Sequence, residues 1–219
     1  MNPNHQQSVE AGGRTGRLIL IRHGETAWSR AGRYTGRTDL PLTEHGERQA
    51  PALAPFLAGL RTELVLTSPL RRARRTAELA GFEAEIEPDL SEWDYGTLEG
   101  RTEQEIGGAL GTPWSIWNAS GGPSPGEALA DITVRADRVL RRIEPQMKKG
   151  GDVLLFAHGH LLCILAVRWL GLPPQAAAAF ALSPASASVL EDRCDSDRGL
   201  NTWNFTPWRC AKPRRPDVQ

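Results

Sequence analysis

Short apolar runs alternate with helix-like stretches along this sequence, and that alternation constrains the fold more than any other feature. Leu18–Ile21, Glu63–Thr67 and Asp152–Ala157 have the length and apolar character of buried strands, and stretches with helical spacing separate them. A chain that alternates strands and helices in this way builds a largely parallel sheet covered by helices. The sequence therefore predicts an α/β layer fold.

Capping residues, proline and apolar periodicity indicate the other elements. Thr43 is placed to cap a helix, and Pro69 suits the first position of a helix that continues to Ala80. Apolar residues recur at helical spacing from Leu129 to Ile143, which predicts a further helix. Strands are also expected at residues 84–87, 186–190 and 200–205, and the region 89–126 is expected to be mostly loops with short helical pieces.

The charge balance and the hydropathy pattern exclude some classes of partner. The 219 residues include 26 basic and 26 acidic side chains, so the formal net charge is zero. Zero net charge argues against bulk attraction to nucleic acid or to an anionic membrane. The longest uncharged stretch, 169–190, contains Pro173 and Pro174 and is not predicted to span a membrane. We expect no nucleic-acid partner and no membrane partner.

The length fits one domain with a tail at each end. We expect 17–206 to form that domain, 1–16 to be a flexible N-terminal tail and 207–219 to be a basic C-terminal tail. The first sixteen residues lack the apolar segment of a secretory signal, and the three cysteines are odd in number and far apart. These features predict a reduced, cytoplasmic protein.

Three of the predicted strands end in polar residues of catalytic type. Arg22 and His23 follow the first run, Ser68 follows the second, and His158 follows the run that ends at Ala157. In open parallel sheets, ligands bind beyond the carboxyl ends of the strands. Two histidines and an arginine at such an edge predict a pocket for an anionic ligand.

Four arginines occur between positions 71 and 75, at the start of a predicted helix. Three of them are expected on a solvated face. Only an arginine in the first turn can lean toward the strand ends, and Arg72 is the best placed. The planar guanidinium of arginine can donate two parallel hydrogen bonds to a phosphate group.

A loop rich in acids and aromatic residues follows the third strand. It contains Glu92, Asp94 and Glu99 close to Trp93 and Tyr95. An acid that aromatic rings partly desolvate can serve as a general acid. The pattern does not distinguish among the three acids.

Other chemistries have weaker support. Residues 122–126 match the G-x-S-x-G motif of α/β-hydrolases, but Pro125 has no N–H to donate to an oxyanion hole. His158 and His160 have no further metal ligand at diagnostic spacing, so we predict no metal. Cys163 lies within an apolar run and does not fit a reactive thiolate loop.

Four blocks, in order along the chain, resemble the histidine phosphatase superfamily, which includes cofactor-dependent phosphoglycerate mutases and many phosphatases. The blocks are Arg22–Thr26, Gly32–Gly36 with Asp39–Thr43, Ser68–Ala73, and Leu90–Gly100 with Ala157–His160. The resemblance covers about 18–190 and is closest to small acid phosphatases and fungal sedoheptulose-bisphosphatase-like enzymes. It implies a phosphoglycerate mutase-like fold, a three-layer α/β/α sandwich with a mostly parallel central sheet.

The same resemblance implies roles for individual residues. His23 matches the nucleophile, and Glu92 matches the acid that protonates the leaving group. The positions that surround the transferred phosphoryl group are matched by Arg22, Arg72 and His158. Contacts to substrate are implied for Ser29, Thr35, Gly36 and Gly159. Ser29 is a departure, because many relatives have asparagine at its position. No metal or cofactor is implied.

Together these features predict a metal-independent phosphomonoester hydrolase that acts through a phosphohistidine on a small phosphorylated metabolite. A mutase must hold a second anionic group, yet the stretch 93–134 contains one basic residue, Arg101. Charge complementarity therefore favours hydrolysis. The alternatives are a cofactor-dependent phosphoglycerate mutase and a non-catalytic phospho-ligand or protein-binding module on the same fold. The partners expected are a small phosphorylated substrate and, at most, a second copy of the chain in a homodimer.

Overall fold

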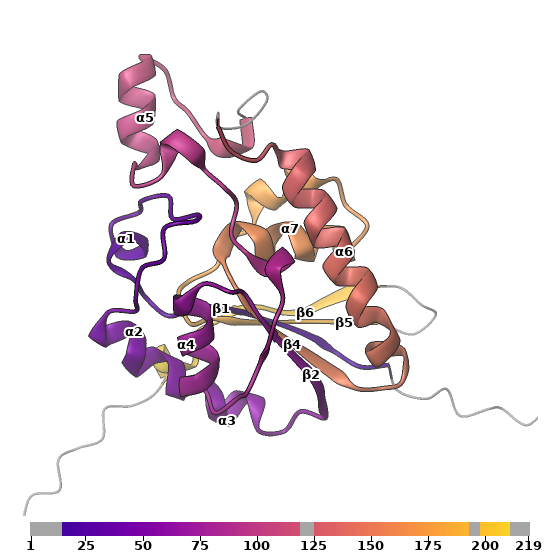
Figure 1. The fold of residues 1–219 in the computed structure, drawn as a ribbon. Helices are drawn as coiled ribbons and strands as arrows, with labels where there is room; N and C mark the ends of the chain where they lie inside the picture. The colour runs from indigo at the N-terminus through magenta and orange to yellow at the C-terminus, as the bar shows by residue number, and fades with distance from the viewer. Residues whose placement is uncertain (1–14, 119–124, 193–197, 211–219) are drawn as a thin grey trace, which may run out of the picture.

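A six-stranded sheet forms the middle of the molecule (Figure 1). The computed structural model describes residues 15–118, 125–192 and 198–210. The strand order across the sheet is β3-β2-β4-β1-β5-β6. The first four of these strands are parallel, β5 runs antiparallel to β1, and β6 runs antiparallel to β5. The strands are β1 (Leu18–Arg22), β2 (Thr62–Thr67), β3 (Glu85–Ile86), β4 (Asp152–Ala157), β5 (Ala187–Asp192) and β6 (Arg198–Phe205).

Helices cover both faces of the sheet, so the predicted α/β fold with a mostly parallel sheet is confirmed (Figure 1). The α-helices are α1 (Ala27–Arg30), α2 (Glu44–Gln49), α3 (Ala54–Leu57), α4 (Arg71–Leu79), α5 (Glu103–Leu110), α6 (Leu129–Lys148), α7 (Gly159–Trp169) and α8 (Pro207–Cys210). The 3-10 helices are η1 (Ala50–Leu53), η2 (Pro88–Leu90), η3 (Gly96–Leu98), η4 (Ile116–Asn118) and η5 (Pro174–Ala179).

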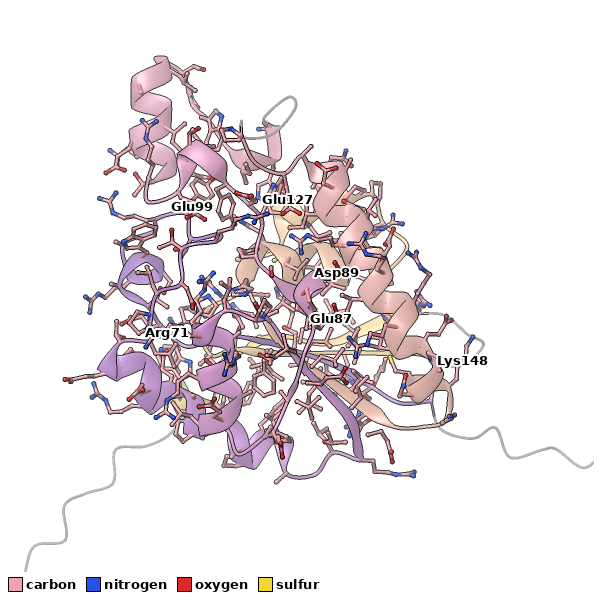
Figure 2. The ribbon with its side chains drawn as sticks, in the orientation of Figure 1. Arg71, Glu87, Asp89, Glu99, Glu127 and Lys148 are labelled. Carbon is pink, nitrogen blue, oxygen red and sulfur yellow. The ribbon has the colours of Figure 1, made fainter. Side chains whose placement is uncertain are left out.

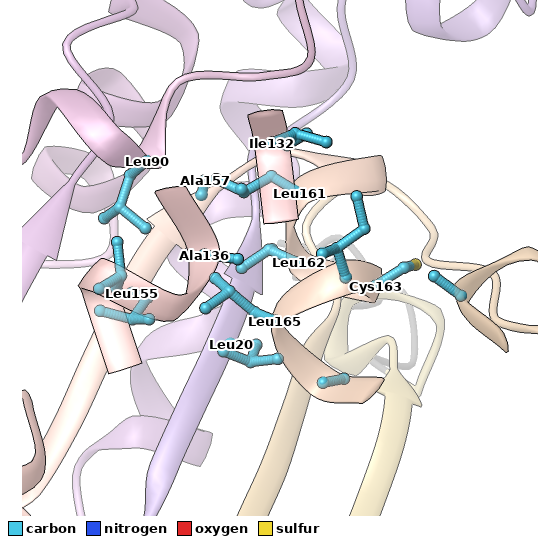
Figure 3. Packing of buried hydrophobic residues seen from close by; sticks show 14 of the residues in the cluster. Leu20, Leu90, Ile132, Ala136, Leu155, Ala157, Leu161, Leu162, Cys163 and Leu165 are labelled. Atoms are coloured by element: carbon cyan, nitrogen blue, oxygen red, sulfur yellow. The ribbon is translucent and has the colours of Figure 1, made fainter. Parts of the chain in front are cut away.

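The alternation of side chains along β1 divides the core into two clusters. Leu18 and Leu20 face α6 and α7, whereas Ile19 and Ile21 face the other layer with Leu53 of η1. Successive side chains of a strand point to opposite faces, so a strand buried on both faces has to be apolar throughout. Figure 3 shows the larger cluster, in which leucines of α7 pack between the sheet and α6.

Asp152 is the first residue of β4, so it lies at the edge of the sheet opposite the carboxyl ends of the parallel strands. Its buried carboxylate accepts hydrogen bonds from the Arg17 backbone N (2.9 Å), the Arg17 Nη2 (2.8 Å) and the Arg61 backbone N (2.9 Å). Burial alone would raise the pKa of this carboxyl, but the bonds from Arg17 and Arg61 outweigh burial and lower it to about 2. The carboxylate therefore binds the residue before β1 (Arg17) and the residue before β2 (Arg61) to the start of β4.

Arginines on one side of α6 hold the segment that leads to the acidic loop. Arg142 pairs with Glu87, and Arg138 donates two hydrogen bonds to Asp89, at 2.6 and 2.7 Å. Figure 2 shows Glu87 and Asp89 lying beside α6, with Glu127 near the start of that helix. The segment has little regular structure of its own, so these side chains fix its path.

Most predicted elements are confirmed, and one prediction needs correction. The helix expected from Pro69 begins at Arg71, because Leu70 has extended backbone angles and its N–H is 3.3 Å from the Ser68 Oγ. The described part of the region 89–126 consists of loops with short helical pieces, as predicted, and the longest piece is the eight-residue helix α5. Thr102 and Glu105 form a capping box at its start, and that T-x-x-E pattern is the signal that would have located it.

The predicted tails, 1–16 and 207–219, lie largely outside the described residues. Of the described parts, Gly16 donates a backbone hydrogen bond to Met147 (2.8 Å), and residues 207–210 form α8. The indole of Trp208 donates to the carbonyl of Pro184 (3.1 Å) and packs edge-on against His45. Among the described helices, none combines the length and the apolar character that crossing a bilayer requires.

Candidate active site

Strand pairing brings the three predicted strand ends together at one edge of the sheet. The His23 N–H donates to the carbonyl of Ala157 (3.0 Å), and the Ser68 N–H donates to the carbonyl of Phe156 (3.0 Å). The site therefore forms where β1, β2 and β4 end side by side, as expected for a parallel sheet.

His23 is buried and has one ring nitrogen committed to the backbone. Its Nδ1 lies 2.7 Å from the carbonyl oxygen of Gly24, which can only accept, so Nδ1 carries the proton. The proton on Nδ1 leaves the lone pair on Nε2. Burial, then the charges of Arg72 and Arg22, lower the pKa of His23 well below its ordinary value. The ring is therefore a neutral imidazole with a free nucleophilic nitrogen.

Gly24 is required by the tight turn after His23. A Cβ at this position would lie 2.7 Å from the carbonyl oxygen of Gly46, closer than such atoms approach. The Gly24 N–H donates to the Oγ1 of Thr76 (3.0 Å), which itself donates to the carbonyl of Arg72 (2.7 Å). These two hydrogen bonds join the turn to α4 and so fix the position of the His23 ring.

His158 lies beside His23, with ring centroids 5.2 Å apart. The Arg72 Nε donates to the His158 Nδ1 (3.2 Å), because an arginine N–H has no lone pair to accept. The other nitrogen, Nε2, then carries the proton and donates to the Ser68 Oγ (2.8 Å). Burial, followed by the charge of Arg72, lowers the pKa of His158 well below its ordinary value. The two histidines are both neutral and have opposite tautomers.

Arg72 forms a fixed positive charge beneath these rings. Its side chain is fully buried, whereas the arginines at 71, 74 and 75 are exposed. Besides His158, it donates to three backbone carbonyls at 2.9 to 3.0 Å, which belong to Thr35, Gly36 and Thr38. These bonds hold the loop before α2 against the end of the sheet. They also leave most of the Arg72 donors occupied.

Arg22 keeps hydrogen-bond donors that are not already occupied by the protein, unlike Arg72. Its Nη1 donates one bond to the carbonyl of Leu182. The Nε is buried and has no partner among the described residues. A buried donor without a partner costs free energy unless a ligand or water satisfies it, so this nitrogen marks a place for an anion. Gly159 leaves room beside the guanidinium, since a Cβ there would lie 3.4 Å from the Arg22 Cζ.

Glu92 is the member of the acidic loop that reaches this edge. Its Oε1 accepts from the N–H groups of Trp93 (2.9 Å) and Leu161 (3.0 Å), and its Oε2 accepts from that of His160 (3.1 Å). The carboxyl group therefore lies at the N-terminus of α7. Oε2 accepts one of these three hydrogen bonds and keeps a lone pair that can hold a proton.

The other two candidate acids have structural partners. The Oδ1 of Asp94 accepts from the N–H of Gly96 (3.0 Å), and its Oδ2 pairs with Arg37. Glu99 accepts from the N–H of Thr38 (3.1 Å). Both acids fix the loop that Arg72 also contacts, and of the three acids Glu92 is the one that lines the main cavity.

Glu127 and Arg135 form a clamp behind the Glu92 loop. Arg135 binds both carboxylate oxygens of Glu127, at 2.6 and 2.7 Å, and donates to the carbonyls of Asp89 (2.7 Å) and Ser91 (2.9 Å). The Asp94 N–H donates to Glu127 at 3.0 Å. The sequence analysis did not assign these two residues a role; Glu127 lies two residues before α6 begins, and Arg135 is on that helix.

A cavity of about 580 Å³ opens in front of His23. Arg22, Glu92 and Gly159 line it together with His23. Rings form much of the remaining wall, from Tyr34, Tyr95, His160 and Phe180. Arg72 and His158 are fully buried and do not line it. The cavity can hold an anion at Nε2 of His23 together with a larger organic group beyond it.

The comparison with family models agrees with this geometry. Residues 18–206 match the model of the histidine phosphatase superfamily (branch 1). The chain belongs to this superfamily. The resemblance that the sequence blocks indicate is therefore confirmed.

Relatives and solved structures place this histidine phosphatase within the superfamily. It is 39% identical over 192 residues to a protein of Mycobacterium tuberculosis named acid phosphatase, covering 86% of this chain and 91% of that protein. It is 36% identical to the sedoheptulose 1,7-bisphosphatase of Saccharomyces cerevisiae, covering 74% and 70%. A solved open-reading-frame structure from M. tuberculosis superposes with a TM-score of 0.82 at 36% identity, covering 89% and 100%. Relatives named phosphoglycerate mutases also match the chain.

The four residues expected to contact substrate in this histidine phosphatase lie in different environments. Ser29, Thr35 and Gly159 line the main cavity, whereas Gly36 lines a neighbouring cavity of about 340 Å³. The Ser29 hydroxyl belongs to the capping box of α1, because it accepts from the Thr26 N–H (2.9 Å) and donates to the Thr26 carbonyl (3.1 Å). The carbonyl of Gly36 accepts from Arg72.

Proposed function

We propose that this protein is a metal-independent phosphomonoester hydrolase that acts through a phosphohistidine at His23 on a small phosphorylated metabolite. The observation that carries the proposal is a neutral His23 with a free Nε2 at the floor of a cavity that Arg22 and Glu92 also line. Membership of the histidine phosphatase superfamily and relatives named as phosphatases support it.

In the first step, the Nε2 of His23 attacks phosphorus and the bond from phosphorus to the alcohol oxygen breaks. The Oε2 of Glu92 delivers its proton to that oxygen, so the product leaves as an alcohol. The phosphorylated ring is cationic, and the carbonyl of Gly24 accepts from its Nδ1–H. Arg22 donates to the phosphoryl oxygens, and Arg72 adds its charge from below in a site of low dielectric.

In the second step, water attacks the phosphohistidine and the bond from phosphorus to nitrogen breaks. The Oε2 of Glu92 takes one proton from that water, which restores the carboxylic acid. Inorganic phosphate leaves, and His23 returns to the neutral tautomer. Dividing the reaction in this way replaces one difficult displacement by two easier ones.

The charges around the cavity support hydrolysis rather than the mutase alternative. A mutase must bind a second anionic group of its substrate. Among the described residues, Arg33 is the one cation besides Arg22 that lines the cavity. Both of its Nη atoms pair with Glu105, at 3.0 and 3.1 Å. Arg101 donates to the Glu105 carbonyl and does not line the cavity. Among the described residues that line this cavity away from Arg22, a second anion therefore finds no cation without an acidic partner.

Hydrolysis of p-nitrophenyl phosphate in the presence of EDTA tests this function. Wild-type protein is expected to turn over, and His23→Ala is expected to lose activity completely. His45→Ala is the matched control, because His45 is an exposed histidine outside the cavity. Activity that survives in His23→Ala, or that requires a metal ion, would overturn the proposal.

We also propose a cytoplasmic location. It is supported by Cys163, a buried cysteine whose thiol is free. Burial raises the pKa of this thiol to about 12, so it stays protonated and unreactive at neutral pH.

A further inference from the structure

The wall of the cavity opposite the nucleophile carries a fixed negative charge, at Glu103 in the first turn of α5. The Oε1 of Glu103 accepts from the Tyr34 hydroxyl (2.8 Å) and the Ser115 hydroxyl (3.3 Å). Burial and this bond to Glu103 both raise the pKa of Tyr34, so the phenol remains a donor. The carboxylate is therefore held in place by neutral groups.

Among the described residues, no lysine or arginine pairs with Glu103. The nearest candidate, Arg33, is committed to Glu105. The bond from the Thr102 backbone, together with Arg33, lowers the pKa of Glu105, so that pair stays ionised and internally balanced. The net charge that the far wall presents to a substrate is therefore that of Glu103.

Apart from Arg33, which pairs with Glu105, this wall presents neutral rings and neutral polar side chains. Burial lowers the pKa of His160, so its ring is uncharged. Its Nδ1 is hydrogen-bonded to the Tyr95 hydroxyl, and its ring stands edge-on to Trp117 at 5.0 Å. Such a surface suits a leaving group with an apolar or sugar face. It offers nothing to neutralise a second anionic group.

We propose that the substrate carries one phosphate as its only anionic group, and that Glu103 selects against a second phosphate or carboxylate. This proposal rests on the phosphatase function proposed above. The preferred leaving group is an alcohol with O–H or N–H donors that reach Glu103, whose Oε2 has no partner among the described residues. Glu103 is thus a specificity-determining residue, and it separates this chain from enzymes that act on bisphosphates.

A matched pair of three-carbon substrates tests the proposal. Glycerol 3-phosphate and 3-phosphoglycerate differ in having a hydroxymethyl group or a carboxylate at the far end. We expect wild-type kcat/KM to be about threefold higher for glycerol 3-phosphate, because Glu103 repels a like charge but is exposed, so solvent screens that repulsion. Fructose 6-phosphate should exceed fructose 1,6-bisphosphate in the same way.

The variant Glu103→Gln keeps an oxygen that can accept from Tyr34 and removes the charge. It is expected to reduce the ratio between the two three-carbon substrates by about threefold, chiefly through better hydrolysis of 3-phosphoglycerate. Glu44→Gln is the control, since Glu44 is an exposed acid on α2 whose side chain is 96% exposed. It removes the same charge and should leave the ratio unchanged.

The outcomes separate this proposal from the function on which it rests. Wild-type protein that hydrolyses p-nitrophenyl phosphate but treats both three-carbon substrates equally would overturn the selection against anions and leave the phosphatase function standing. An unchanged ratio in Glu103→Gln would overturn the role of Glu103. Failure to hydrolyse any phosphomonoester would overturn the proposed function itself.

Discussion

The opposite tautomers of the two neighbouring histidines give the sharpest prediction about the resting site. His23 should carry its proton on Nδ1, since the Gly24 carbonyl can only accept. His158 should carry its proton on Nε2, since Arg72 donates to its Nδ1. A reversed tautomer at His23 would place the proton on the nitrogen that has to attack phosphorus.

The size of the effect follows from the ordinary behaviour of histidine. With a pKa of about 6.5, an unperturbed ring is about 90% protonated at pH 5.5, so the neutral form falls roughly tenfold between pH 7.5 and 5.5. For His23, burial and the charges of Arg72 and Arg22 lower the pKa well below that value. The proton is lost more readily in the folded protein, so the midpoint of His23 is expected to lie below that of an unperturbed histidine.

Nitrogen-15 NMR of the histidine side chains measures both properties together. The signals of His23 and His158 are identified by their loss in the alanine variants, and an unstructured histidine peptide titrated alongside is the reference. We expect both rings to be neutral at pH 5.5, with protonated Nδ1 in His23 and protonated Nε2 in His158. A His23 midpoint near that of the peptide, or the same tautomer in both rings, would refute the electrostatic reasoning.

Two further predictions concern the scaffold. Asp152→Asn is expected to lower the free energy of unfolding by about 2.5 kcal/mol at pH 7, and calorimetry should show a Tm lower by roughly 5–10 °C. Its kcat should change little, because Asp152 lies at the edge of the sheet opposite the site. A lowered carboxyl pKa stabilises the fold above about pH 4, so the difference from wild type should shrink as the pH falls toward 2; a difference independent of pH would contradict it. Arg135→Met loosens the Glu92 loop and should slow hydrolysis of an alkyl phosphate about tenfold more than that of p-nitrophenyl phosphate, whose leaving group needs no acid. Lys148→Met, which breaks an exposed ion pair with Glu144 at the C-terminal end of the same helix, is the control, and equal slowing of both substrates by Arg135→Met would contradict the positioning role.

The sequence predicts well those features that depend on local pattern. β4 has the predicted bounds, Asp152–Ala157, because six consecutive buried residues leave little choice of register or length. Arg72 could be singled out from four arginines because helical periodicity decides which one turns inward. Thr43 caps α2 as expected, accepting from the Gly46 N–H at 3.0 Å.

Features that depend on contacts between distant segments could not be predicted in this way. Glu92 is chosen over the other two acids by N–H groups of α7, and one of them belongs to a residue 68 positions away. The tautomer of His158 depends on Arg72, which is 86 positions away. Glu103 of α5 reaches the cavity wall beside Tyr34, whose hydroxyl donates to it, and no sequence motif predicts that contact.

Trapping the phosphoenzyme tests the central claim most directly. Wild-type protein mixed with a phosphomonoester would be quenched in alkali within the first turnover, digested, and analysed by mass spectrometry. We expect one phosphoryl group on the peptide that contains His23, stable in alkali and lost in acid. An active enzyme with no phosphorylated peptide, or with phosphate on a different residue, would contradict the account.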